Sequence, residues 1–210
     1  VDVVERGQKG FIDPYPWQTE TCLGNWFYGE QYFRENRYKT PAKVLHTLCD
    51  VVSKNGNMML SVPIRGDGTI DKKEREIVEE VGLWLRRYGD AIYGTRPWRI
   101  HAEGPTGSGG GALSEGGQDS SYTSRDIRYV RKGDALHALV LGWPNDGIVR
   151  MTLLGKSNPV SRGKVDRVSL PRGPALPFRC TVDALEVSLP AALQTPIGLA
   201  LIINGSGLVD

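Results

Sequence analysis

The stretch NMMLSVP, residues 57–63, decides the fold of the first part of the chain. It is a short and nearly continuous apolar run, bounded by Gly56 on one side and by the turn-forming letters RGDG on the other. Such a run is typical of a strand that is buried on both faces, as strands are in a parallel sheet. We therefore predict a buried strand at this position.

Helices are predicted on both sides of this strand. Thr40 and Pro41 form an N-cap and first-turn pair, and apolar residues then recur at helical spacing until KNGN, residues 54–57. Asp71 and Glu74 form a capping-box pair before a second helix, which ends at Gly89. The second helix carries one apolar stripe, made of Ile77, Val78, Val81, Trp84, Leu85 and Tyr88. The order helix, buried strand, helix favours an α/β fold, either a barrel or a doubly wound sheet.

The sequence pattern changes after Trp98. Residues 104–121, GPTGSGGGALSEGGQDSS, are rich in Gly and Ser, and we expect a flexible loop there. Alternating runs then recur at strand-like spacing between Pro, Gly and Asn turns, which is typical of an antiparallel β-sandwich. These runs cover residues 135–143, 148–155, 164–171, 184–190 and 197–205. We place the boundary between the two domains at residues 97 and 98.

Composition excludes several classes of function. The chain is 40% hydrophobic and 24% charged, as globular proteins are, and its net charge of +2 comes from scattered Lys and Arg, so we expect no nucleic-acid partner. No apolar run approaches the roughly 20 residues of a membrane helix. The three Cys and three His are far apart, so we expect no metal site, no cofactor and no disulfide framework. The start, VDVVERGQ, has no initiator Met and no signal-peptide pattern, and we expect a chain cut from a longer one.

The candidate site residues lie near the start of the chain. Two tryptophans occur in WQTETCLGNWFY, residues 17–28, which we interpret as a loop because Pro14 and Pro16 precede it. Aromatic rings pack on the C–H faces of sugars, and a carboxyl group can protonate a glycosidic oxygen. The candidates are therefore Trp17, Trp26 and Tyr28 for substrate binding, with Glu5 and Glu20 for acid/base chemistry. From these residues alone a second interpretation stays open, in which the aromatics bury the loop and the carboxylates are merely solvated.

Two longer motifs in this sequence resemble the α-L-fucosidase family of glycoside hydrolases. The first is NGNMMLSVPIRGDGTI, residues 55–70, and the second is GLWLRRYGDAIYGTRPW, residues 82–98. The W-x-T-C pattern with a downstream aromatic pair is similar to the family's substrate-side loop, and it matches Trp17, Thr21, Cys22, Trp26 and Tyr28. GPT (104–106), YTSRDIRY (122–129) and LGWP (141–144) resemble the family's C-terminal sandwich.

The resemblance implies a fold and an activity. Residues 1–97 would be the C-terminal portion of a catalytic (β/α)8-like barrel, and residues 98–210 a β-sandwich that supports it. The chain would be part of a retaining α-L-fucosidase that removes terminal α-L-fucose from glycoconjugates or oligosaccharides. The family's Asp nucleophile and fucose-binding histidines would precede this chain, so we expect the chain alone to be inactive. The resemblance suggests a secreted, periplasmic or lysosomal protein and leaves an oligomeric assembly open.

The resemblance also bears on the general acid/base. One branch of the family carries it as a Glu just after a strand, where Glu5 follows VDVV, although the usual Thr-Pro is replaced by Val3-Val4. Another branch carries it in W-E-x-C, where Glu20 keeps its distance to Cys22. Glu5 is our first choice, because a strand end is held by its sheet, and Glu20 is the alternative. The other functions that we keep open are a non-catalytic carbohydrate-binding module and a structural or scaffold module.

Overall fold

The computed structural model describes residues 1–107, 110–114 and 122–209, which form two compact units. Unit 1 comprises residues 1–86 together with residues 110–114, and unit 2 comprises residues 87–107 and 122–209. The division at Arg86 and Arg87 falls inside a helix, before the boundary predicted at residues 97 and 98. We call residues 110–114 the returning segment, because the chain comes back to unit 1 there after it has entered unit 2.

Unit 1 contains a three-stranded parallel sheet with the order β1-β2-β3. Its strands are β1 (Asp2–Glu5), β2 (Trp17–Cys22) and β3 (Gly56–Ser61). Its helices are α1 (Glu30–Glu35), α2 (Pro41–Ser53) and the larger part of α3 (Lys72–Tyr88). The predicted strand and its parallel sheet are thus confirmed, as are both predicted helices.

Local capping explains where the two long helices begin. The Thr40 hydroxyl accepts a hydrogen bond from the Lys43 amide at 3.1 Å, and Pro41 occupies the first turn of α2. The Asp71 carboxylate accepts a hydrogen bond from the Glu74 amide at 2.8 Å at the start of α3. Both caps were predicted from the sequence, because a cap involves only residues that are three positions apart.

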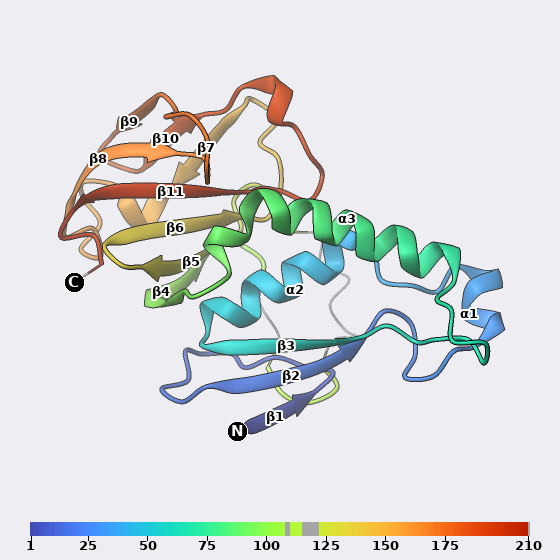
Figure 1. Ribbon diagram of the computed structural model, residues 1–210. Helices are drawn as coiled ribbons and strands as arrows, with labels where there is room; N and C mark the ends of the chain where they lie inside the picture. Colours follow the sequence, from blue (N-terminus) through green and yellow to red (C-terminus); the bar gives the residue numbers. More distant parts are fainter. Residues whose placement is uncertain (108–109, 115–121, 210) are drawn as a thin grey trace. The chain divides into compact units, whose positions relative to one another are not determined.

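One face of the parallel sheet is covered and the other is open. Trp17, Thr19 and Thr21 alternate along β2 and are buried, and α2 lies across this face in Figure 1. Side chains of the opposite parity point to the other face, where Val3 is 48% exposed and Met59 is 47% exposed. The prediction that β3 is buried on both faces is therefore wrong for this chain. The alternation of side chains along a strand puts half of its apolar residues on the open face.

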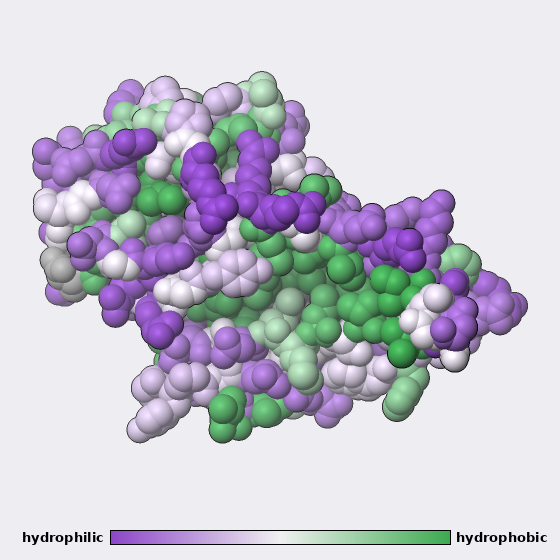
Figure 2. Space-filling view, viewed as in Figure 1, coloured by the Kyte–Doolittle hydropathy of each residue, from purple (hydrophilic) through white to green (hydrophobic). Residues whose placement is uncertain are grey.

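Apolar surface also follows the helices of unit 1. Figure 2 shows apolar residues gathered along α2 and the adjoining side of α3 in this view. The predicted stripe of α3 is buried at Trp84, which is 7% exposed, whereas Val78 is 37% exposed. The stripe is therefore only partly covered.

Unit 2 consists of two antiparallel sheets, as predicted. The larger sheet has five strands in the order β4-β5-β6-β11-β8, and the smaller has three in the order β7-β10-β9. The strands of the larger sheet are β4 (Arg96–Glu103), β5 (Ile127–Lys132), β6 (Ala135–Val140), β8 (Lys164–Ser169) and β11 (Leu199–Ser206). Those of the smaller sheet are β7 (Ile148–Met151), β9 (Phe178–Cys180) and β10 (Leu185–Ser188). Short 3-10 helices occur at Gly89–Ala91, Thr152–Leu154 and Ala191–Leu193.

The core of unit 2 lies in these sheets. Tyr129, Leu136 and Leu201 of the larger sheet have no exposed area, and neither do Met151 and Leu185 of the smaller one. Two antiparallel sheets with buried apolar faces are what a β-sandwich requires.

One further expectation is wrong, and another stays a prediction. Residues 17–22, interpreted as the start of a loop, form β2, because the main chain pairs with β1 and β3 on both sides. Within the Gly/Ser-rich stretch 104–121, the returning segment makes backbone hydrogen bonds to the turn after β1, and the expectation of a flexible loop stays a prediction. Residues 108–109 and 115–121 of that stretch lie outside the described residues.

Candidate active site

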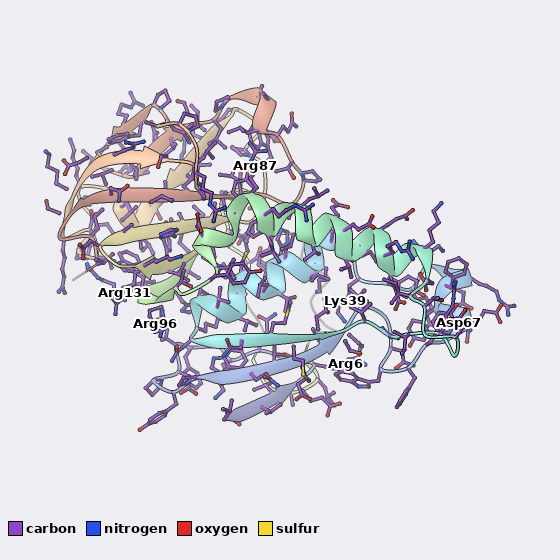
Figure 3. All side chains as sticks on the ribbon, in the orientation of Figure 1. Arg6, Lys39, Asp67, Arg87, Arg96 and Arg131 are labelled. Carbon is purple, nitrogen blue, oxygen red and sulfur yellow. The ribbon has the colours of Figure 1, made fainter. Side chains whose placement is uncertain are left out.

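The candidate site is the edge of unit 1 where its three parallel strands end. Because the strands are parallel, Glu5, Cys22 and Ser61 all lie at this edge, and the loops that follow the strands meet there. Figure 3 places Arg6 and Lys39 at the same edge, and the Lys39 ammonium donates to the Cys22 carbonyl at 2.5 Å. In barrel enzymes the active site lies at the carboxyl ends of the strands.

Glu5 and Glu20 are neighbours in the sheet. The register pairs them directly across β1 and β2, and strands of a sheet lie about 4.8 Å apart. Partners in a parallel pair point to the same side, and this side is the open face, where Glu5 is exposed and Glu20 is half-buried. The Gln18 amide donates to the Glu20 carboxylate at 3.2 Å. The structure therefore brings together the two carboxylates that the sequence offered as alternatives.

The turn after β1 is held from several directions. Arg6 has a left-handed φ of 46°, and its amide donates to the Glu20 carbonyl at 2.7 Å. The Thr19 hydroxyl donates to the Gly7 carbonyl at 2.6 Å. The Leu113 amide, from the returning segment, donates to the Glu5 carbonyl at 2.8 Å. The backbone on which the Glu5 side chain stands is thus fixed by β2 and by the returning segment.

Gly7 is required by the close approach of the returning segment. A Cβ atom at this position would lie 2.0 Å from the Gly111 carbonyl oxygen. The Gly111 amide donates to the Gln8 carbonyl at 2.8 Å, and the two residues form an antiparallel bridge. This contact was not predicted, because no local pattern in a Gly/Ser-rich stretch indicates which part of the chain it will contact.

Trp17 is a core residue in this structure. Its side chain has no exposed area, and its indole nitrogen donates to the Lys54 carbonyl at 2.9 Å. A Cβ atom on Gly56 would meet the Trp17 ring at 2.6 Å and Val51 at 2.7 Å, so the indole packs tightly between β3 and α2. A side chain with this placement cannot lie against a sugar. The expectation that Trp17 contacts substrate is therefore wrong, because its side chain points to the covered face of the sheet.

Trp26 and Tyr28 lie in the loop after β2 and are both half-buried. The Arg65 guanidinium donates to the Tyr28 hydroxyl at 3.4 Å and lies 5.5 Å from the centre of its ring. The same guanidinium lies 5.9 Å from the Phe33 ring. Arg65 follows β3, so it joins the loops after two neighbouring strands. Arg65 was not predicted as a site residue, because only the pairing of β2 with β3 brings it beside Tyr28.

A buried acidic group lies at the start of α3. The Tyr38 hydroxyl donates to the Asp71 carboxylate at 2.5 Å, and Asp71 has no exposed area. Glu74 is 1% exposed, and one oxygen of its carboxyl group has no hydrogen-bond partner among the described residues. Burial, together with the neighbouring Asp71 charge, raises the pKa of Glu74 to about 7. Burial and the bond to Asp71 also raise the pKa of Tyr38.

Within residues 1–107, 110–114 and 122–209, no three His, Cys, Asp or Glu side chains are grouped so that they could hold a metal ion. In the same residues, no helix is long and apolar enough to cross a membrane.

Comparison with protein families gives a consistent result. Residues 1–90 match the family model described as alpha-L-fucosidase. An alpha-L-fucosidase of Branchiostoma floridae is 28% identical over 162 residues, which are 75% of this chain and 31% of that protein. The human tissue alpha-L-fucosidase is 30% identical over 110 residues, which are 52% of this chain and 20% of that protein.

Solved structures agree with these relatives. One alpha-L-fucosidase structure aligns with a TM-score of 0.74 and 27% identity, and the alignment covers 96% of this chain and 42% of that one. The alpha-fucosidase of Thermotoga maritima in complex with fucose aligns with a TM-score of 0.68 and 29% identity, over 91% of this chain and 41% of that one.

These similarities indicate the class: the proteins that this chain resembles are glycoside hydrolases. Its relatives are alpha-L-fucosidases, and the chain corresponds to the C-terminal part of them. The resemblance stated from the sequence motifs is therefore confirmed. The chain spans no more than about a third of the length of the curated relatives given above.

Proposed function

We propose that this chain is the C-terminal part of a retaining α-L-fucosidase that removes terminal α-L-fucose from glycoconjugates or oligosaccharides. Unit 1 would supply the last strands of a (β/α)8-like barrel, and unit 2 a β-sandwich that supports it. The observation that carries this proposal is the position of Glu5 at the carboxyl end of β1, beside Glu20 of the neighbouring parallel strand. The fucose bound to the related Thermotoga maritima enzyme supports the choice of sugar.

The proposed chemistry needs two carboxyl groups roughly 5–5.5 Å apart, one to attack the sugar and one to exchange protons with the leaving oxygen. We assign the proton-exchanging role to Glu5. The turn after Glu5 is held by Thr19 and by the returning segment, so its carboxyl group can be aimed reproducibly. Glu20 remains the alternative, because it stands beside Glu5 on the same face. The attacking Asp would lie in a part of the protein that precedes this chain.

Substrate contacts would come from the loop after β2. Trp26 and Tyr28 are half-buried, so each ring keeps area for packing on the sugar or on the group attached to it. Arg65 would hold Tyr28 in place. Trp17 supports the sheet from its covered face and is left out of the binding site.

The experiment compares Glu5→Ala with Glu20→Ala in the full-length enzyme. Only substrates with poor leaving groups need protonation, so Glu5→Ala should slow these far more than activated aryl fucosides. Azide should restore turnover and yield fucosyl azide of retained configuration. If Glu20→Ala gives this pattern and Glu5→Ala does not, the assignment moves to Glu20. If neither gives it, the proposed acid/base role is wrong for both.

The 210-residue chain provides a second test. Without the attacking Asp it should not hydrolyse an aryl fucoside, although it should still fold. Turnover by the purified chain that is lost when one of its own carboxylates is mutated would overturn the proposed division of roles.

A further inference from the structure

Unit 2 contains a cleft of about 760 Å³, and its lining includes none of the residues assigned to the proposed active site. Its walls come from the end of β4 and the following residues, from residues 123–125, and from residues 144–152. Pockets that bind small molecules usually measure about 300–1,000 Å³ and are formed before the ligand arrives. The size of this cleft therefore fits a ligand as large as one or two sugar rings rather than a simple ion.

Two carboxylates, Asp126 and Glu103, hold the walls of the cleft in place. Asp126 has no exposed area, and its oxygens accept hydrogen bonds from the amides of Thr106 at 2.8 Å and Thr123 at 2.7 Å. It thereby ties together two segments that line the cleft. Glu103 accepts hydrogen bonds from the amides of Thr152 at 2.9 Å and Leu153 at 3.1 Å, and it also bonds to Tyr129. These bonds fix the shape of the cleft.

The charged side chains that line the cleft differ in whether they already have hydrogen-bond or ion-pair partners. Both oxygens of Glu103 are occupied by the bonds described above. Asp146 accepts from the Ile148 amide at 3.1 Å and pairs with Arg150 at 2.8 Å, and these contacts lower its pKa. Arg125 is exposed and lines the cleft, and within the described parts of the chain no hydrogen bond or ion pair reaches its guanidinium group.

The remaining lining has two kinds of surface. Ser124 and Asn145 supply a hydroxyl and an amide, which can bond to sugar hydroxyls. Pro105, Pro144 and Ile148 supply apolar wall, on which the C–H face of a ring can rest. A guanidinium group binds a carboxylate through two parallel hydrogen bonds. The combination fits a ring that carries both hydroxyl groups and a carboxylate.

We propose that this cleft binds a carboxylate-bearing sugar of an acidic glycan, with Arg125 bonding to its carboxylate. The proposal goes beyond the proposed hydrolase function and does not depend on it, because every residue involved belongs to unit 2. It gives unit 2 a binding role in addition to the supporting role proposed above.

The test measures binding by the complete 210-residue chain. Glucuronic acid and N-acetylneuraminic acid are titrated, and amide chemical shifts report where they bind. Glucuronamide, which replaces the carboxylate by a neutral amide, and acetate, which lacks the ring, are the matched ligands. Both acidic sugars should shift the amides of residues 103–105, 123–125 and 144–152. Glucuronamide and acetate should bind at least about tenfold more weakly, as expected when one charged partner or the ring contacts are lost.

Two variants complete the test. Arg125→Gln should weaken the binding of glucuronic acid by about tenfold or more. The control is Arg131→Gln, which should leave binding unchanged. Arg131 is exposed, lies on β5 and does not line the cleft (Figure 3). Because Arg125 is exposed, its variant should melt like the parent chain.

Four results would overturn the proposal. The first is equal binding of glucuronamide and glucuronic acid, and the second is equal binding by the Arg125→Gln variant and the parent chain. The third is the absence of shifts around the cleft at millimolar sugar. Tighter binding of a sulfated neutral sugar than of either acidic sugar would also reject the assignment to carboxylates. None of these readouts depends on hydrolysis, so the proposed function can fail or succeed separately.

Discussion

Replacing Glu74 by Gln should change how the stability of unit 1 depends on pH. Glu74 is almost fully buried beside Asp71, and its pKa rises from 4.5 to about 7 in the folded chain. An acid whose folded pKa is raised binds its proton more tightly in the folded state than in the unfolded state. Stability is therefore lost as pH rises from about 4.5 to about 7, where only the unfolded state readily releases the proton.

The size of the effect follows from the size of the shift. Each pKa unit corresponds to about 1.4 kcal/mol, so the shift of Glu74 corresponds to roughly 3 kcal/mol at pH 8. Gln cannot ionise and does not repel Asp71. The Glu74→Gln variant should match the parent chain near pH 4.5 and exceed its unfolding free energy by up to about 3 kcal/mol at pH 8.

Urea denaturation at pH 5 and pH 8 measures the difference, with hydrogen exchange of α2 and β2 reporting unit 1 separately. Glu76→Gln is the matched control, because Glu76 is on the same helix but is largely exposed and lies 3.8 Å from the Lys72 ammonium. That variant should show only a small change, nearly the same at both pH values. An equal effect of Glu74→Gln at pH 5 and pH 8 would refute the reasoning.

Three other changes test the packing of unit 1 by urea denaturation. Trp84→Ala should lower the unfolding free energy by roughly 3–5 kcal/mol, because the side chain is 7% exposed, and unaltered stability would show that it is not a core residue. Lys54→Met should lower it by roughly 3–5 kcal/mol, since it leaves the fully buried Asp50 without its 2.5 Å ion pair, and adding Asp50→Leu should recover part of the loss. Gly7→Ala should cost roughly 1–3 kcal/mol and release amides of the returning segment to hydrogen exchange. Gly10→Ala, with no atom within 4 Å of its new Cβ, should do neither, and similar behaviour of the two variants would contradict the close-approach argument.

The sequence predicts what is determined locally. The helices begin at Thr40 and Asp71 because each cap needs only residues three positions away. The strand at residues 57–63 is evident from an apolar run with turns at both ends. The antiparallel strands of unit 2 that alternate strongly in sequence, such as β6 and β11, were predicted for the same reason.

The parts that were missed depend on partners far away in the chain. WQTETC becomes β2 because β1 and β3 pair with it, although the prolines before it favour a loop. Trp17 is buried, and Glu20 stands beside Glu5, only as a result of that register. A shift of one residue would exchange the two faces of β2, and no local pattern sets the register of parallel strands that are joined by long connections. β9 has three residues, which is too short for a periodic signal.

The returning segment has a consequence for synthesis on the ribosome. Gly7 and Gln8 are made about 100 residues before Gly111, which closes over them and is made only after β4 has been translated. At about 5–20 residues per second, the delay between these positions is roughly 5–20 s. Throughout that interval the Glu5 and Gln8 carbonyls lack the amides of Leu113 and Gly111 that later bond to them, and unpaired backbone edges attract other strands. The time that unit 1 spends without these bonds therefore depends on the rate of translation. Slowing the ribosome between the codons for Gln8 and Gly111 should lower the soluble yield more than slowing it after the codon for Tyr122.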